Sequence, residues 1–225
     1  MIHGSPTAAL MLALTISLSP AFAAATYHDS LVAGDKALAA SSVDDALGAY
    51  SAALDHATSD GERALALAKQ GYVLAYLKHD YAAARTAVDE GLAMKDLAPV
   101  ARVTLLQVVA HCQMNADKDF AAAAVTLEEA LGLEGVDWAK PGLTLALGDC
   151  QRETGAMDKA LATYAEILAM PQADAGTKAG SLLCSGFIHQ YDRHDAAKAR
   201  ECYEKAVALR PGLKAEVDGH LGRLP

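Results

Sequence analysis

The chain has 225 residues, of which 52% are hydrophobic and 21% are charged, so it is long and apolar enough to bury a core and is not a disordered protein. Aromatic residues make up only 5%, and the apolar set is rich in alanine, which favours closely packed helices. Lys and Arg total 19 against 28 Asp and Glu, which gives a net charge of −9. Because no basic run offsets this charge, nucleic acid is not expected as a partner.

The N-terminal segment has the features of a secretory signal peptide. Residues 8–18 (AALMLALTISL) form an apolar run that is followed by Pro20 and by the small-residue site Ala21-Phe22-Ala23. We therefore expect cleavage after Ala23, with residues 1–23 as signal peptide and residues 24–225 exported to the periplasm or secreted. The run is too short to span a bilayer comfortably, so no stable membrane span is expected after cleavage.

One submotif recurs five times in the rest of the chain: a small residue, about a dozen positions, an alanine, and an apolar or aromatic residue near four positions later. The clearest copy has Gly148, Ala160 and Tyr164 and is followed by Pro171. The alanines assigned to the second helix of each copy are Ala46, Ala83, Ala123, Ala160 and Ala199. These positions are 37, 40, 37 and 39 residues apart, which indicates a helical repeat.

This pattern resembles the tetratricopeptide repeat, W-x2-L-G-x2-Y…A-x3-F…P, at Leu147-Gly148, Ala160, Tyr164 and Pro171. The resemblance covers nearly all of the chain after residue 23 and implies an all-α, right-handed α-solenoid of about five helix-turn-helix repeats. The copies are longer than the usual 34 residues, so longer turns are expected. The expected repeats are residues 27–60, 64–97, 101–135, 141–174 and 178–211.

The segment after the last repeat is expected to close the solenoid. Its apolar residues, Leu213, Val217, Leu221 and Leu224, recur at near-helical spacing. They predict a short capping helix within residues 212–225, because a terminal repeat needs a polar outer cover. An up-and-down helical bundle is the alternative architecture. Five copies in register favour the solenoid.

The sequence proposes no catalytic, cofactor or metal site, so we do not expect an enzyme. His189, His194 and Asp195 are close along the chain, but their spacing matches no standard metal site. Four cysteines, Cys112, Cys150, Cys184 and Cys202, would enter an oxidising compartment. Cys112 and Cys150 follow the small residue of their repeats by two positions, which favours buried free thiols. If a disulfide forms, Cys184 with Cys150 or Cys202 is the least strained pairing.

The tetratricopeptide resemblance places a candidate binding groove on the concave wall, which first helices line. The candidate groove residues are Tyr72, Tyr76, Gln107, His111, Asn115, Asp149, Arg152, Phe187 and Tyr191. Two aromatic pairs, Tyr72 with Tyr76 and Phe187 with Tyr191, bracket a polar middle. Rings would supply affinity, and Asn115 and Arg152 would hold a ligand's backbone or carboxylate. Alternatively, the rings fill the inside of a tightly wound superhelix.

These features predict an exported scaffold or adaptor that holds a protein or peptide in its concave groove. Two alternatives belong to other classes: a structural subunit that assembles with copies of itself, and an accessory factor of an envelope enzyme or transport system. The residues identify neither the partner nor the oligomeric state.

Overall fold

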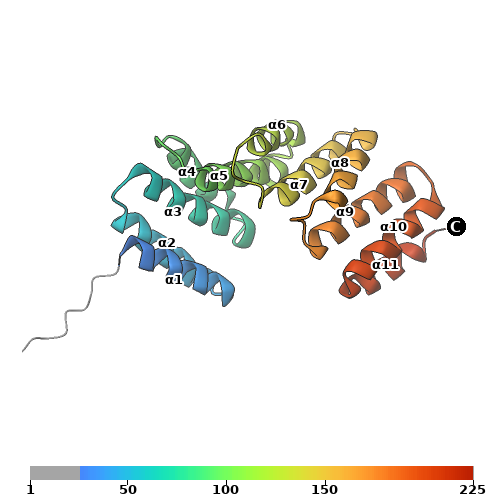
Figure 1. Ribbon diagram of the computed structural model, residues 1–225, viewed down its shortest axis with the longest axis horizontal. Helices are drawn as coiled ribbons and strands as arrows, with labels where there is room; N and C mark the ends of the chain where they lie inside the picture. The colour runs from blue at the N-terminus through green and yellow to red at the C-terminus, as the bar shows by residue number, and fades with distance from the viewer. Residues whose placement is uncertain (1–25, 225) are drawn as a thin grey trace, which may run out of the picture.

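The computed structural model describes residues 26–224, which fold into helices joined by short turns and stacked into an arch (Figure 1). The hairpins pair α1 (Tyr27–Ala39) with α2 (Val43–His56), α3 (Asp60–Tyr72) with α4 (Tyr81–Leu92), α5 (Pro99–Cys112) with α6 (Phe120–Leu131), α7 (Lys140–Glu153) with α8 (Met157–Ala169), and α9 (Ala175–Phe187) with α10 (Ala196–Leu209). This arrangement confirms the predicted all-α solenoid of helix-turn-helix repeats. From the second onward, the hairpins begin one to four residues before the expected repeat starts. The predicted signal peptide, residues 1–23, lies outside the described residues.

Close contact between a glycine and a tyrosine joins the two helices of the first, fourth and fifth hairpins. A Cβ atom on Gly148 of α7 would lie 2.4 Å from the Cε1 atom of Tyr164 on α8. The same contact joins Gly34 to Tyr50 and Gly186 to Tyr203. All three tyrosines are fully buried, because the absent side chain lets each ring lie against the backbone of the facing helix.

The first helix ends differently in different hairpins. In the second, third and fifth hairpins it continues into a π-helical turn, and these turns are η1 (Val73–Leu77), η2 (Gln113–Asp117) and η3 (Ile188–Asp192). A π-helical turn contains one more residue than an α-helical turn.

This extra residue corrects one prediction about the second hairpin. The packing alanine of α4 is Ala84, which is fully buried, and not Ala83, which is only partly buried. Ala84 follows Gly71 by 13 positions, whereas Ala160 follows Gly148 by 12. The assumption of equal spacing in both copies placed the alanine one residue too early.

His189 and His194, which are close to Asp195 in sequence, have structural positions at the turn inside the last hairpin. His194 has a left-handed backbone, with φ 53°, and Asp195 is the N-cap of α10, where its carboxylate accepts a hydrogen bond from the Lys198 N–H. His189 lies in η3. Residues 26–224 contain no group of three side chains placed to hold a metal ion.

A short 3₁₀ turn, η4 (Pro211–Leu213), leads into α11 (Lys214–Leu221), which covers the end of the last hairpin (Figure 1). Val217 is 1% exposed and packs in a cluster with Ala199, Tyr203 and Ala206 of α10. The predicted capping helix is therefore present. Among residues 26–224, no helix combines the length and the hydropathy that a membrane span requires.

Candidate functional site

A cavity of about 410 Å³ opens between the first helices of the second, third and fourth hairpins. These helices lie on the inner side of the arch, with α6 and α8 outside (Figure 1). The cavity is lined by six of the predicted groove residues, Tyr72, Tyr76, Gln107, His111, Asn115 and Asp149. Much of the remaining wall is apolar and includes Met114, Leu127, Leu143 and Leu145. Helical periodicity thus placed these six side chains on one surface.

Three rings stack along one side of the cavity. The ring centroids of Tyr72 and Tyr76 are 4.6 Å apart, and those of Tyr76 and His111 are 3.8 Å apart. Tyr76 is partly buried, and its hydroxyl donates to the Gln107 carbonyl at 3.4 Å, so it belongs to the wall. Tyr72 is 40% exposed. It is therefore the ring that a ligand can cover.

The polar groups beside the stack are fixed by local contacts. The Asn115 side-chain amide donates to the His111 carbonyl at 2.9 Å and lies 3.2 Å from His111 Nδ1. Burial lowers the pKa of His111 below its ordinary value, so its imidazole is neutral at pH 7. This side of the cavity consequently carries no net charge.

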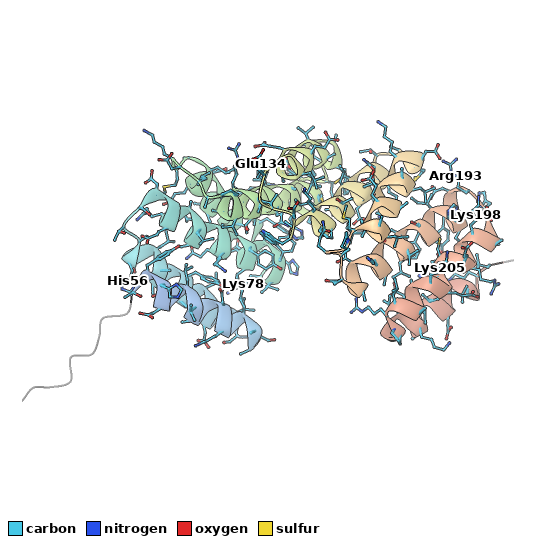
Figure 2. The ribbon with its side chains drawn as sticks, in the orientation of Figure 1. His56, Lys78, Glu134, Arg193, Lys198 and Lys205 are labelled. Carbon is cyan, nitrogen blue, oxygen red and sulfur yellow. The ribbon has the colours of Figure 1, made fainter. Side chains whose placement is uncertain are left out.

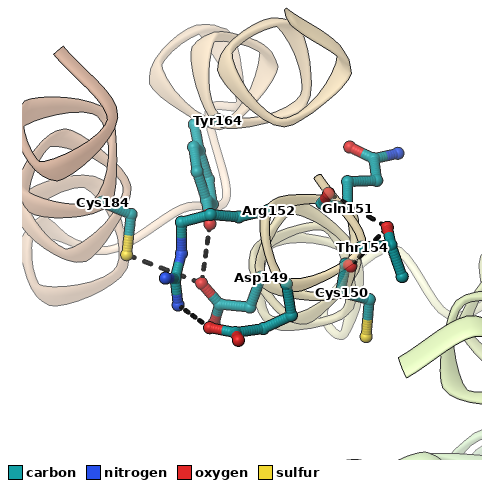
Figure 3. Close-up of polar contacts among 8 residues, drawn as sticks. Asp149, Cys150, Gln151, Arg152, Thr154, Tyr164 and Cys184 are labelled. Carbon is teal, nitrogen blue, oxygen red and sulfur yellow. Dashed lines mark hydrogen bonds and ion pairs between the residues drawn. The ribbon is translucent and has the colours of Figure 1, made fainter. Parts of the chain in front are cut away.

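Asp149 supplies the only formal charge among the side chains that line the cavity. The Tyr164 hydroxyl donates to Asp149 Oδ1 at 2.7 Å, and the Cys184 thiol donates to the same atom at 3.6 Å (Figure 3). Burial raises the pKa of Asp149, although the Tyr164 hydrogen bond and the Arg152 charge act in the opposite direction. The carboxylate is thus held in place in a poorly solvated position.

Arg152, which we expected to help hold a ligand carboxylate, does not line the cavity. Its guanidinium pairs with its neighbour Glu153 at 2.7 Å, on the side of α7 that faces Cys184 (Figure 3). Within residues 26–224 it forms no ion pair with Asp149 at 4.0 Å or less.

Phe187 and Tyr191 also lie away from the cavity and do not stack on each other as Tyr72 and Tyr76 do. The Phe187 ring packs against those of Tyr203 and His220, with centroids 5.9 and 4.8 Å apart. Tyr191 is 50% exposed and borders a separate, smaller pocket near the C-terminal end. The difference arises because α11 packs against the hairpin that carries Phe187 and Tyr191, whereas another hairpin packs against the one that carries Tyr72 and Tyr76.

The surroundings of Asp149 were missed in the sequence, although one signal was present. Asp149 and Tyr164 are 15 positions apart, and the first hairpin has the same pair at the same interval, Asp35 and Tyr50. This repeated interval between an aspartate and a tyrosine was the signal in the sequence for the hydrogen bond at Asp149. The four cysteines are all free. Cys112 and Cys150 are buried, as their positions in the repeat indicated.

Stacked helical hairpins with small residues opposite large ones, around a concave inner wall, define a tetratricopeptide-repeat solenoid. The sequence itself matches no protein-family model and no curated protein.

Solved structures have the same fold. YrrB, described as a TPR protein with an unusual peptide-binding site, is 20% identical with a TM-score of 0.57, over 87% of this chain and 91% of that chain. The MamA RS-1 ArsTM double mutant is 18% identical with a TM-score of 0.57, over 83% of this chain and 95% of that chain. The C-terminal part of a TPR repeat-containing protein from Cytophaga hutchinsonii is 17% identical with a TM-score of 0.55, over 87% of this chain and 74% of that chain. At these identities the likeness establishes the fold.

Proposed function

We propose that this chain is an exported scaffold that binds a segment of a partner protein in the cavity between α3, α5 and α7. The observation that carries the proposal is the combination of an exposed Tyr72 ring, an apolar wall and a single carboxylate, that of Asp149, around one 410 Å³ cavity. A large ring beside a few fixed polar groups is the usual composition of a peptide site, because the ring supplies affinity and the polar groups set the register. The peptide-binding description of the similar YrrB structure supports the same activity here.

The binding site is tested by replacing one exposed tyrosine inside the cavity and one outside it. Tyr72→Ala should weaken capture of partners from an envelope extract by about 1–2 kcal/mol, because it removes the exposed ring. Tyr191→Ala is the matched control, since Tyr191 is also an exposed tyrosine but lies at the C-terminal end. Quantitative mass spectrometry of the retained proteins provides the measurement. Full capture by Tyr72→Ala, with loss in Tyr191→Ala, would move the site to that end.

The alternative of a self-assembling subunit has its own test. Light scattering of the purified protein at two concentrations should give the same mass if the groove serves other proteins. A mass that rises with concentration would favour assembly through the outer helices or the ends.

Export is a separate part of the proposal and rests on the apolar run, Pro20 and the Ala21-Phe22-Ala23 site. The intact mass of protein recovered from the envelope fraction should correspond to a chain that begins at Ala24. A mass that retains Met1 would contradict cleavage and export by this route.

A further inference from the structure

Two hairpins of the solenoid contain the same pairing of an aspartate with a buried tyrosine. Asp35 in α1 and Asp149 in α7 each follow the glycine that contacts a buried tyrosine. Each carboxylate accepts a hydrogen bond from that tyrosine's hydroxyl at 2.7 Å, from Tyr50 in the first hairpin and from Tyr164 in the fourth. The two sites are therefore internal copies of one arrangement.

The first copy is completed by a cation from the next hairpin. Lys69 of α3 places its ammonium 2.7 Å from Asp35 Oδ1 and 5.7 Å from the centroid of the Tyr50 ring. Lys69 precedes Gly71 by two positions. An ammonium is consequently the natural partner of this carboxylate and tyrosine pair.

The fourth copy lacks that cation. The position two residues before Gly186 is Cys184, whose thiol lies 3.6 Å from Asp149 Oδ1. A thiol is a weak, uncharged donor, and burial raises the pKa of Cys184 to about 12, so it supplies no compensating charge. The carboxylate therefore occupies the same setting as Asp35 but without an ammonium (Figure 3).

A second ion pair is present at both of these interfaces between hairpins, so the missing cation is a local difference. Lys78 pairs with Asp44 between the first and second hairpins, and Arg193 pairs with Asp158 between the fourth and fifth. Lys78 follows Gly71 by seven positions, and Arg193 follows Gly186 by the same interval. Figure 2 shows them on opposite limbs of the arch.

The neighbours of Asp149 leave one negative charge unbalanced. Arg152 pairs with Glu153, whose charge further disfavours ionisation of Asp149. The fourth hairpin thus has two carboxylates, Asp149 and Glu153, near one guanidinium that pairs with Glu153 alone, whereas in the first hairpin Asp35 and Lys69 balance each other. A ligand in the cavity reaches this unbalanced charge because Asp149 lines it.

We propose that the bound segment supplies the missing cation, as a lysine side chain whose ammonium pairs with Asp149 while an adjacent apolar residue covers Tyr72. This inference rests on the proposed peptide groove and adds the chemistry of its ligand. It reverses the expectation of a bound carboxylate, which Asp149 would repel. The net charge of −9 acts in the same direction by attracting cationic segments.

The probes are pools of decapeptides with acetylated N-termini and amidated C-termini. Each pool has one fixed central residue, which is lysine, acetyl-lysine, arginine or glutamate, and flanking positions randomised among uncharged residues. The immobilised protein should retain the lysine pool about tenfold more strongly than the acetyl-lysine pool, as a charge-assisted hydrogen bond predicts. Stronger retention of the arginine pool than of the lysine pool would overturn the assignment to lysine.

Variants separate this site from general attraction to an acidic protein. Asp149→Asn should abolish the preference for lysine, whereas Asp35→Asn, which changes the net charge equally, should keep it. Cys184→Lys should also abolish it, because the new ammonium would pair with Asp149 as Lys69 pairs with Asp35. Cys184→Met, a neutral side chain of similar length, should keep the preference. Thermal melts confirm folding, and the two aspartate variants decide the result if either cysteine variant does not fold.

The outcomes distinguish the two proposals. If no pool is retained, the peptide groove itself is wrong. If the lysine and acetyl-lysine pools are retained equally, the groove stands and the assigned cation is wrong. An unchanged preference in Asp149→Asn, or an equal loss in Asp35→Asn, would likewise overturn the assignment to Asp149.

Discussion

Addition of a single methyl group to Gly148 should destabilise the best-matched hairpin. The new Cβ atom would lie 2.4 and 2.7 Å from two carbons of the Tyr164 ring, which is fully buried and hydrogen bonded to Asp149. Overpacking costs about 1–3 kcal/mol, and displacing the ring weakens a hydrogen bond worth about 1 kcal/mol. The higher helix propensity of alanine returns about 1 kcal/mol. The expected net loss of unfolding free energy for Gly148→Ala is therefore about 1–3 kcal/mol.

The matched control is Gly48→Ala in α2. An added Cβ atom at Gly48 meets nothing within 4 Å, so only the helix propensity changes and the protein should gain about 1 kcal/mol. Urea unfolding followed by far-UV circular dichroism measures both variants. If Gly148→Ala is as stable as the unchanged protein, the close approach of α7 and α8 does not limit packing, and the reasoning fails.

Three further predictions concern single groups. Burial raises the pKa of Asp149 in the folded protein, so the folded state favours the protonated carboxyl group. The contribution of Asp149 to stability is therefore fully present below the ordinary carboxyl pKa, and it is lost as the pH rises through the pKa of the folded state. Asp149→Asn should therefore be at least as stable as the unchanged protein at pH 7 in urea unfolding, and a large loss would contradict this. Burial raises the pKa of Cys150 to about 11, and partial burial beside Asp149 raises that of Cys184 to about 12. Mass spectrometry should therefore show slow alkylation of both thiols by iodoacetamide at pH 8 until urea is added, and rapid labelling of the native protein would refute this protection. Val217→Ala should cost roughly 1–2 kcal/mol by loosening the capping helix, whereas the exposed Val125→Ala should change the melt little. Equal effects would mean that α11 does not cap the core.

The hairpins could be predicted from the sequence because their packing depends on residues a fixed distance apart. Gly148 and Tyr164 meet wherever two antiparallel helices are joined by a short turn, so the pattern of small and large residues was sufficient. The π-helical turns could not be predicted in the same way. An added residue near the end of a helix leaves the hydrophobic pattern of that helix unchanged, so nothing in the pattern showed that the packing position had moved from Ala83 to Ala84.

The arrangement of the candidate groove side chains was predictable only where their neighbours in space were other repeats. Tyr72, Tyr76 and His111 line one cavity because a regular solenoid follows each hairpin with a similar one. Phe187 was not, since its neighbour is the capping helix, whose docking depends on tertiary contacts such as that with His220. The partner of Arg152 was missed for a related reason. Glu153 is adjacent in sequence, and spacing alone does not show which of two carboxylates a guanidinium contacts.

The π-helical turns have a consequence for how such a binding surface changes in evolution. Tyr76 lies in η1, and Asn115 lies in η2, so both cavity residues belong to turns that already contain an added residue. The first and fourth hairpins end their first helices without this residue and still place a glycine against a buried tyrosine. Single-residue insertions and deletions are therefore absorbed next to the cavity, away from the contacts that hold the hairpins together. A change in chain length at these turns would therefore reshape the cavity and leave the glycine–tyrosine contacts in place.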